Sequence, residues 1–272
     1  MTSHDVVSVL RRFTKIKQIG HTGTLDPFAE GVLPICIGKA TRLIEFLTDD
    51  KEYLATVQFG SATDTFDIEG KTTFKSDKKV DKDSILKYLK DFEGEIEQLP
   101  PIYSAIKVNG KKLYEYARNG EDIEIKPRKV FIENVELRSF NHDLQQAEIL
   151  IKCSKGTYIR SIANDLGNKL ETGGHLIKLV RTQAGRFRVE NSIKLEGIDV
   201  EKNLINPLEM LNLPKIELNE NNFEKIQHGM TIENIDNSLK NCEIVVLTYN
   251  RNKICAVGMV DRNKIKTKKV FI

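Results

Sequence analysis

The chain has 272 residues, of which 40% are hydrophobic and 30% charged, so it is long enough to bury one large core and a smaller one. Its 42 Lys and Arg residues exceed its 39 Asp and Glu residues by only three, so net charge alone does not indicate a polyanionic partner. No apolar run is long enough to span a bilayer and the N-terminus has no signal-peptide pattern, so we expect a cytoplasmic protein.

The four cysteines indicate neither disulfides nor a metal centre. None belongs to a Cys-x-x-Cys pair, and none has a histidine at ligand spacing: Cys36, Cys153, Cys242 and Cys255. We therefore expect a reduced protein without a bound metal.

Hydrophobic periodicity predicts the elements of the first half. In chain order they are a helix at residues 2–13, a strand at 31–38, a short helix at 40–47, a strand at 53–59 and a helix at 81–92. Ala55, Val57 and Phe59 alternate along one face of the second strand. Ile85, Leu86 and Leu89 are the inward residues expected in the last helix.

The second half continues without a β-α-β repeat. After a break at Pro100-Pro101 and a hairpin turn at Asn109-Gly110, we expect a helix at 113–118, strands at 130–140 and 147–153, a helix at 157–170 and a strand at 175–181. Beyond Asn206-Pro207 we expect a helix at 223–228 and strands at 243–247, 254–260 and 267–272. This order predicts an α+β fold with a small, basic, β-rich C-terminal domain.

One acid stands in an unusual setting within the stretch GHTGTLDPFAEGVLPICIGKATR, residues 20–42. Pro27 restricts Asp26 to extended backbone, and Gly20 and Gly23 admit angles that other residues avoid. The sequence thus shapes a loop around one carboxylate and the imidazole of His21, and such loops often carry chemistry. By pattern alone, an Asx turn or a helix cap at Asp26 is the commoner interpretation.

Two other loop motifs are excluded. A P-loop ending at Gly38-Lys39 needs a glycine at Leu33 and a hydroxyl at Ala40. In the acidic stretch DTFDIEG, residues 64–70, a calcium loop would need carboxylates at Thr65 and Ser76. We interpret that stretch as a polar turn or the rim of a site.

Arg160 lies in the first turn expected for the helix at 157–170. Backbone donors at a helix N-terminus favour anions, and a guanidinium can hold a carboxylate with two hydrogen bonds. A surface role is the commoner one for an arginine at such a position. Local basic clusters are also candidate contacts to a polyanion: Arg11, Arg12, Lys15 and Lys17; Lys107, Lys111 and Lys112; Lys126, Arg128 and Lys129; Lys264, Lys266, Lys268 and Lys269.

Several motifs, in order and spread over most of the chain, resemble those of the TruB family of tRNA pseudouridine synthases. They are GHTGTLDP at 20–27, GVLPICIGKATR at 31–42, Lys-Glu-Tyr at 51–53, TDTFDIEG at 63–70, QLPPIYSAIKVNGKKLYEYARNG at 98–120 and CSKGTYIRSIANDLG at 153–167. The resemblance implies a pseudouridine synthase fold with a mixed, mainly antiparallel sheet flanked by helices. It places a catalytic domain at 1–205 and a PUA-like RNA-binding domain at 206–272.

The resemblance also implies roles for six residues. Asp26 would be the catalytic acid and Arg160 its ion-pair partner. Tyr53 would stack on the target base and help remove the C5 proton. Tyr158 and Leu179 would line the uracil pocket, and His21 would help displace the nucleotide. It implies as substrate the T-stem and T-loop of tRNA, modified at uridine 55, with no cofactor. We expect it to work without guide RNA, because no extension beyond the two domains is seen, and we also expect a monomer.

One departure from the family pattern keeps alternatives open. Family members carry a strand and a Lys-Pro-x-Gly turn before the Thr-Ser that matches Thr2-Ser3, whereas this sequence starts at Met1. A wrong start site, a trimmed chain or a real loss would each produce this, and only a real loss would leave one strand position unfilled. A non-catalytic tRNA-binding or RNA-folding protein on the same scaffold is the main alternative. A glycoside hydrolase that pairs Asp26 with Glu30 or Asp64 is a more distant one.

Overall fold

The structure is a computed structural model that describes residues 1–234, 236, 238–250 and 253–272. The chain packs into two compact units, and neither is one continuous segment. The first unit comprises Met1–Ser3, Gly23–Pro34 and Asp49–Ile193, and the second His4–Thr22, Ile35–Thr48 and Lys194–Ile272. The expected division into a catalytic domain at 1–205 and a C-terminal domain at 206–272 therefore stays a prediction. Within the described part of the chain, no helix has the length and apolarity needed to cross a membrane.

A mixed sheet forms the centre of the first unit. Its strands are β4 (Lys51–Phe59), β7 (Gly94–Gln98), β10 (Arg128–Asn141), β11 (Gln146–Cys153), β12 (Gly174–Ala184) and β13 (Phe187–Arg188). Their order is β13-β12-β4-β11-β10-β7, with every neighbouring pair antiparallel, and β2 (Glu30–Gly31) adds a parallel pairing to β12. The predicted mixed, mainly antiparallel sheet is confirmed.

The register of β4 fixes which side chains enter the core. Ala55, Val57 and Phe59 are buried, as their alternation predicts, and Tyr53 is buried on the same face. Opposite them on β11, Ile151 pairs with Tyr53 and Ile149 with Ala55. Successive side chains of a strand point to opposite faces of the sheet, so every second residue of β4 faces the core.

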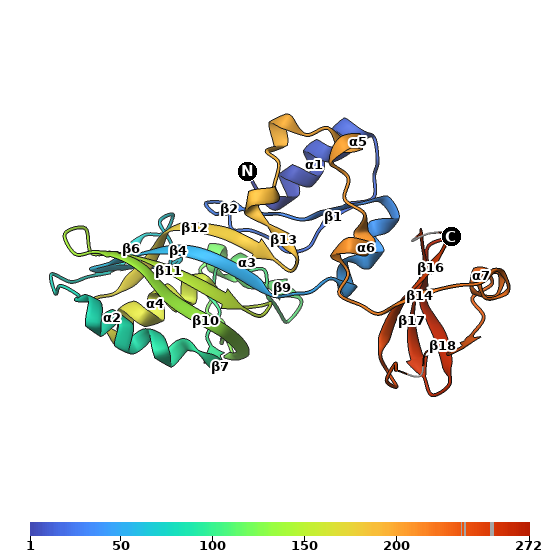
Figure 1. Cartoon of the computed structure of the whole chain (residues 1–272). Coiled ribbons are helices and arrows are strands. Elements are labelled where there is room, and N and C mark those ends of the chain that lie inside the picture. The colour runs from blue at the N-terminus through green and yellow to red at the C-terminus, as the bar shows by residue number, and fades with distance from the viewer. Residues whose placement is uncertain (235, 237, 251–252) are drawn as a thin grey trace. The chain divides into compact units, whose positions relative to one another are not determined.

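Two helices cover one face of this sheet, α2 (Lys82–Leu89) and α4 (Ile159–Lys169), as Figure 1 shows. Asp81 caps α2 by accepting a hydrogen bond from the Ser84 N–H at 2.8 Å. The α-helical part ends at Leu89 and continues as a 3-10 turn, η2 (Lys90–Phe92). The prediction that Leu86 points inward is wrong: it is 40% exposed, whereas Ile85 and Leu89 are buried against the sheet and Tyr88 packs partly on the same core.

Shorter elements complete the first unit. They are β5 (Ser61–Thr63), β6 (Thr72–Lys75), β8 (Lys107–Val108), β9 (Lys111–Lys112), α3 (Leu113–Asn119) and η3 (Val189–Asn191). The predicted hairpin turn is confirmed between β8 and β9, where Asn109 and Gly110 have φ of 51° and 83°. Asn-Gly suits a turn with two positive φ angles.

The N-terminal segments of the second unit depart partly from prediction. They are α1 (Ser3–Thr14, of which Ser3 belongs to the first unit), β1 (Ile19–His21), β3 (Ile35–Ile37) and η1 (Gly38–Phe46). The predicted strand at 31–38 is too long, because Gly31 has a φ of 110° and Pro34 has no N–H to donate to a ladder. Only β3 remains of it beyond Gly31. The predicted helix at 40–47 is the 3-10 helix η1.

The C-terminal part of the second unit is β-rich, as predicted. Its sheet has the order β14-β16-β17-β18-β15, formed by β14 (Lys215–Glu217), β15 (Ile232–Glu233), β16 (Ile244–Tyr249), β17 (Lys253–Asp261) and β18 (Lys264–Val270). The accompanying helices are η4 (Leu195–Gly197), α5 (Val200–Asn203), α6 (Pro207–Met210) and α7 (Glu220–Gln227). Ile226 of α7 packs into the core of this sheet. Such a module is consistent with the expected PUA-like domain.

Candidate active site

Asp26 lies in a tight turn of the first unit. Its backbone carbonyl accepts a hydrogen bond from the Ala29 N–H at 2.9 Å, and the Oγ of Ser3 accepts one from the N–H of Leu25 at 2.9 Å. Leu25, Phe28 and Ala29 pack against the main core. No helix begins at Asp26, so the interpretation of this acid as a helix cap is wrong. The turn holds the carboxylate at the edge of the core with its side chain 33% exposed.

Arg160 holds this carboxylate with two hydrogen bonds. Its Nε donates to Oδ2 of Asp26 and its Nη2 to Oδ1, both at 3.0 Å. Arg160 is the second residue of α4 and is only 5% exposed. This side-on geometry fixes the position of the carboxylate as well as balancing its charge. The convergence of Asp26 and Arg160, which lie 134 residues apart, is therefore a feature of the fold.

A second carboxylate, Asp67, contacts the same guanidinium. Nη1 of Arg160 lies 3.3 Å from Oδ2 of Asp67, and Asp67 is only 4% exposed. Thr65 Oγ1 and the Glu69 N–H donate to Oδ1 of Asp67 at 2.6 and 3.1 Å. The guanidinium also donates to two backbone carbonyls, that of Thr65 at 3.1 Å and that of Tyr103 at 3.0 Å. Arg160 thus links three chain segments beneath the acid.

Sequence analysis placed Asp67 only in a polar turn or the rim of a site. No local pattern distinguishes it from Asp64 or Glu69 in the same stretch. Its role depends on an isolated β-bridge to Leu176 that brings the turn against β12. Among the described residues, no group of three or more His, Cys, Asp and Glu side chains is arranged to hold a metal ion.

Burial raises the pKa of Asp26 above its ordinary value. The negative charge of Asp67 raises it further, while the charge and hydrogen bonds of Arg160 lower it. Desolvation disfavours the charged form of any acid, and here it outweighs the ion pair. The charge of the ionised Asp26 carboxylate is therefore only partly compensated, and this carboxylate is more basic than that of a surface aspartate.

Tyr53 belongs to the same electrostatic environment. Burial raises the pKa of its phenol to about 12, with Asp26 adding to the rise and the charge of Arg181 opposing it. The phenol is therefore neutral near pH 7 and offers a ring face and a hydroxyl rather than a phenolate.

Tyr158 is the N-cap residue of α4, two positions before Arg160. Its N–H donates to Oε1 of Gln98 at 2.7 Å, and its carbonyl accepts from Nε2 of the same amide at 3.0 Å. Burial raises the pKa of the Tyr158 phenol, and the charges of Arg160 and Asp26 act on it in opposite directions. The buried side chain of Gln98 therefore fixes the backbone from which Tyr158 and Arg160 project.

The remaining two predicted residues lie in different surroundings. Leu179 is 4% exposed on β12, opposite Ala55 of β4, within the same core as Tyr53. His21 ends β1 in the second unit, where it pairs with Ile35 of β3. Five of the six predicted site residues thus belong to the first unit, and the position of His21 relative to Asp26 stays a prediction.

Arg181, which is fully buried on β12, is a residue of this region that the sequence patterns did not indicate. It donates hydrogen bonds to the carbonyls of Val32 and Gly23 at 2.8 and 3.2 Å, on either side of Asp26. An arginine two residues after the inward Leu179 of a strand is a usable signal, because charged side chains are rarely buried without a specific partner.

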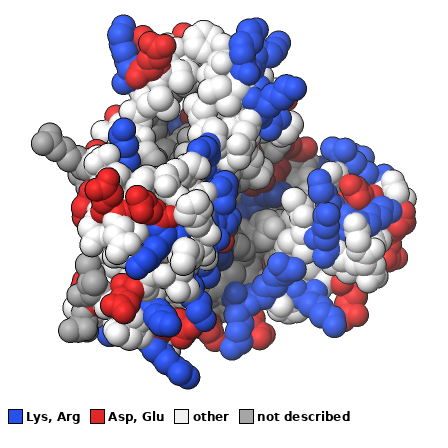
Figure 2. Space-filling view, turned by 90° about the vertical axis from the view of Figure 1, so that its right-hand side faces the viewer, with Lys and Arg blue, Asp and Glu red and all other residues white. Residues whose placement is uncertain are grey.

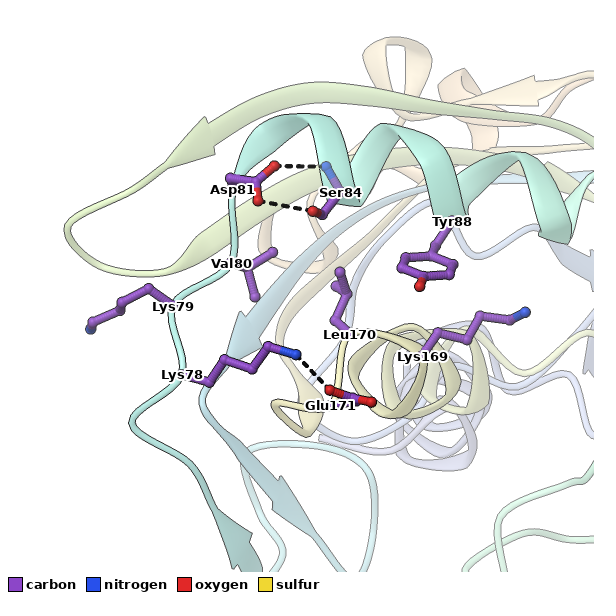
Figure 3. Close-up of a pocket in the computed structure, with 9 residues that line it drawn as sticks. All are labelled: Lys78, Lys79, Val80, Asp81, Ser84, Tyr88, Lys169, Leu170 and Glu171. Atoms are coloured by element: carbon purple, nitrogen blue, oxygen red, sulfur yellow. Dashed lines mark hydrogen bonds and ion pairs between the residues drawn. The ribbon is translucent and has the colours of Figure 1, made fainter.

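A pocket of the first unit contains none of these residues. Figure 3 shows it between the segment before α2, the helix α2 and the end of α4, with Lys78, Tyr88 and Lys169 among its lining residues. The Nζ of Lys78 lies 2.7 Å from Oε2 of Glu171 across its edge. Its lining is an ordinary ion-paired surface, and the chemical groups described above lie elsewhere.

The predicted basic clusters lie on exposed elements. Figure 2 shows Lys and Arg side chains in several groups over the face in view, with Asp and Glu side chains between them. Lys264, Lys266, Lys268 and Lys269 all belong to β18. Lys266 is ion-paired with Asp261 and Lys269 with Glu45, so these two cations are partly neutralised.

Family models match most of the chain. Residues 11–159 match the model described as TruB family pseudouridylate synthase (N terminal domain), and residues 160–211 match the tRNA pseudouridylate synthase B C-terminal domain. The chain is 43% identical over 278 residues to the tRNA pseudouridine synthase B of Caldanaerobacter subterraneus subsp. tengcongensis, covering 100% of this chain and 95% of that protein. It is 44% identical over 294 residues to the protein of the same name from Staphylococcus aureus, with coverage of 100% and 95%. These matches confirm the resemblance drawn from the motifs.

Solved structures share the fold. The chain superposes with a TM-score of 0.76 on the structure titled Crystal Structure of a Cbf5-Nop10-Gar1 Complex, at 25% identity, covering 100% of this chain and 82% of that one. A second structure, of an archaeal box H/ACA sRNP Nop10-Cbf5 complex, gives a TM-score of 0.73 at 24% identity, with coverage of 100% and 83%. The predicted fold class is thereby confirmed.

Proposed function

This chain belongs to the TruB family of tRNA pseudouridine synthases, and on that premise we propose that it isomerises uridine 55 in the T-loop of tRNA to pseudouridine. The observation that carries the proposal is the side-on ion pair between Asp26 and Arg160, both oxygens at 3.0 Å, in a partly desolvated setting. A carboxylate that is fixed in direction and raised in basicity suits a reaction at a sugar carbon or a base.

The reaction is an isomerisation in which all atoms are conserved. The bond between uracil N1 and ribose C1′ breaks, the base turns, and a bond forms between C5 and C1′. C5 loses a proton and N1 ends with one, so neither an oxidant nor a reductant is consumed. The protein has to supply a carboxylate beside the sugar and the base, and a pocket that retains the detached base.

Asp26 is the residue proposed to act on the reacting atoms, and Arg160 keeps it ionised and aimed. Tyr53 would stack on the uracil, because a buried ring with a neutral phenol offers a flat face. Removal of the C5 proton by Tyr53 would require its phenol to be activated, since its pKa lies at about 12. Tyr158 and Leu179 would complete the walls of the pocket.

The target nucleotide has to leave its stack to reach this carboxylate. Unstacking costs a few kcal/mol, and stacking on an aromatic ring returns about 1–3 kcal/mol per base. We assign this displacement to His21, with Tyr53 receiving the base. The T-stem would be recognised through its backbone, because side chains cannot read the deep major groove of A-form RNA.

The basic residues of β18 are the proposed contacts to the T-stem of tRNA. The protein is proposed to act in the cytoplasm. Exposed cations such as Lys264 and Lys268 suit phosphates, and binding that depends on them weakens with salt. We expect the chain to act as a monomer and to need no guide RNA.

The test compares the parent chain with Asp26→Asn and with Glu30→Gln on an unmodified tRNA transcript. Glu30 is the matched control, an exposed carboxylate four residues along the same segment. Nucleoside mass spectrometry after carbodiimide labelling locates pseudouridine. The parent and Glu30→Gln should modify uridine 55, while Asp26→Asn should fall below about one thousandth of the parent rate yet still bind the transcript.

Two outcomes would contradict the proposal. An active Asp26→Asn variant would remove Asp26 from the chemistry. Binding of tRNA without modification by the parent would favour the alternative, an RNA-binding or RNA-folding protein on the same scaffold.

A further inference from the structure

Arg181 is the largest fully buried side chain of the described residues, with 0% exposure. It lies on β12, where Leu179 faces the core and Arg181 pairs with Tyr53 of β4. A buried guanidinium is costly unless its donors find acceptors, so its contacts are informative.

Those contacts span the loop that carries Asp26. Nε donates to the carbonyl of Val32 at 2.8 Å, and Nη2 donates to the carbonyl of Gly23 at 3.2 Å. Gly23 precedes Asp26 by three residues and Val32 follows it by six. Because Nε and Nη2 belong to one planar group, they hold both ends of the loop at a set separation from β12.

The main chain reinforces only the second of these ends. The Val32 N–H donates to the carbonyl of Arg181 at 2.9 Å, and Gly31 pairs in parallel register with Arg181. A Cβ at Gly31 would lie 2.2 Å from that carbonyl oxygen, so the two backbones touch. At Gly23 the connection to β12 is made by the side chain. A Cβ there would lie 3.3 Å from Cε of Lys51 and 3.6 Å from Nη1 of Arg181, so both side chains lie beside the loop backbone.

No carboxylate of the described residues forms an ion pair with Arg181, and its Nη1 has no hydrogen-bond partner in that part of the chain. Lys51 lies close by, and burial together with the charge of Arg181 lowers the pKa of its ammonium. An apolar side chain would be the cheaper occupant of such a position. The hydrogen bonds to the carbonyls of Val32 and Gly23, rather than a gain in the stability of the fold, explain why a guanidinium occupies this position.

We propose that Arg181 is a positioning residue that holds the Gly23–Pro34 loop on β12 and so sets the place of Asp26 against Arg160. It contacts the loop backbone and lies close enough to Tyr53 for its charge to act on that phenol. It acts on the reaction through Asp26 and not on the substrate. This role rests on the proposed function only for its effect on turnover, while the anchoring of the loop is independent of the reaction. Misplacement of a reacting group by about 1 Å can cost about 100-fold in rate.

The test uses Arg181→Lys, Arg181→Gln and the control Arg188→Lys in the full chain. Lysine keeps the charge but lacks the fixed planar pair of donors, and glutamine leaves no buried charge to compensate. Arg188 is an exposed arginine of the neighbouring strand β13. Three quantities are measured: the single-turnover rate at saturating tRNA, the Kd for tRNA, and hydrogen exchange at the amides of Leu25, Ala29 and Val32, alongside the unfolding transition.

In the Arg181 variants we expect a rate about 100-fold lower, a Kd within about threefold of the parent because the binding surface is untouched, and faster exchange at the loop amides, with other protected amides unchanged. Arg188→Lys should match the parent in all three.

Equal losses in rate and affinity would show that Arg181 is a substrate contact. Unchanged hydrogen exchange of the loop amides in a folded variant would refute the anchoring role. If neither variant unfolds cooperatively, Arg181 serves the whole fold and the loop-specific role is overturned. A parent without pseudouridine formation refutes the proposed function, yet loop exchange still decides the anchor.

Discussion

Several charged side chains are buried in the first unit, whereas charged side chains of the C-terminal sheet of the second unit are exposed. In the first unit, Asp67, Arg160 and Arg181 are all at most 5% exposed and Asp26 is partly buried. In the C-terminal sheet the lysines of β18 stand outward, and Thr248 is the buried polar residue among those described there. Both parts have apolar cores of Ile, Val, Leu and Ala.

The proposed function accounts for this difference. A carboxylate that reacts must be desolvated and held in one direction, so the first unit accepts the cost of buried charge and offsets it with hydrogen bonds from one guanidinium. Contacts to a nucleic-acid backbone need cations in water, where counterions can be exchanged for phosphates. Changes to the two parts should therefore alter different measured quantities.

Apart from the substitutions of Asp26 and Arg181 described above, the largest effect is expected from Asp67→Asn. This change removes one of the two anionic partners of Arg160, so the guanidinium is held less firmly against Asp26. We expect the single-turnover rate to fall about 100-fold, with the Kd for tRNA unchanged. Glu69→Gln is the control, because Glu69 is exposed in the same turn and only its backbone N–H contacts Asp67. A normal rate in Asp67→Asn would mean that Arg160 is held in place without the charge of Asp67.

The pH dependence of the rate should give the next effect. Asp26 acts as a carboxylate, and its raised pKa places the acid limb above the value of about 3.9 for an ordinary aspartate. Below that limb the rate should fall about tenfold per pH unit. Because Asp67 raises this pKa, the residual activity of Asp67→Asn should have its limb at lower pH. A limb that does not move would show that Asp67 has no electrostatic influence on Asp26.

Stability should respond to pH in the opposite sense. The folded pKa of Asp26 lies above the unfolded one, so the folded state binds more protons between the two values. The contribution of Asp26 to the free energy of unfolding therefore decreases as pH rises through that window, while activity increases. Urea unfolding of the parent and of Asp26→Asn across this range measures it. Parallel pH profiles for the two proteins would refute a raised pKa.

The smallest effect is expected from Lys264→Ala with Lys268→Ala on β18. Both lysines are exposed, so stability should stay within about 0.5 kcal/mol. The Kd for tRNA should rise about threefold to tenfold at physiological salt, and the slope of log K against log salt should become shallower by about 0.7–0.9 per lost phosphate contact. The rate at saturating tRNA should not change. Lys240→Ala, an exposed lysine of the same unit outside the cluster, is the control.

Sequence periodicity was sufficient for most elements, because each depends on neighbours along the chain. The alternation of Ala55, Val57 and Phe59 predicts β4, and Asn109-Gly110 predicts the hairpin. It failed where a local feature interrupts a regular pattern. Gly31 and Pro34 shorten the predicted strand at 31–38, and Leu86 turns outward although it is as apolar as its neighbours.

By itself the sequence determined the family and the fold class and indicated Asp26 as the candidate acid, because motif order and local backbone chemistry are set by residues close together along the chain. Only the tertiary structure decided which groups surround that acid. Arg160 lies 134 residues from Asp26, and Asp67 lies 93 from Arg160. Arg181 meets Gly23 across 158 residues. Partners at such separations are selected by strand register and helix packing, and the pKa of Asp26 depends on the burial that this packing creates.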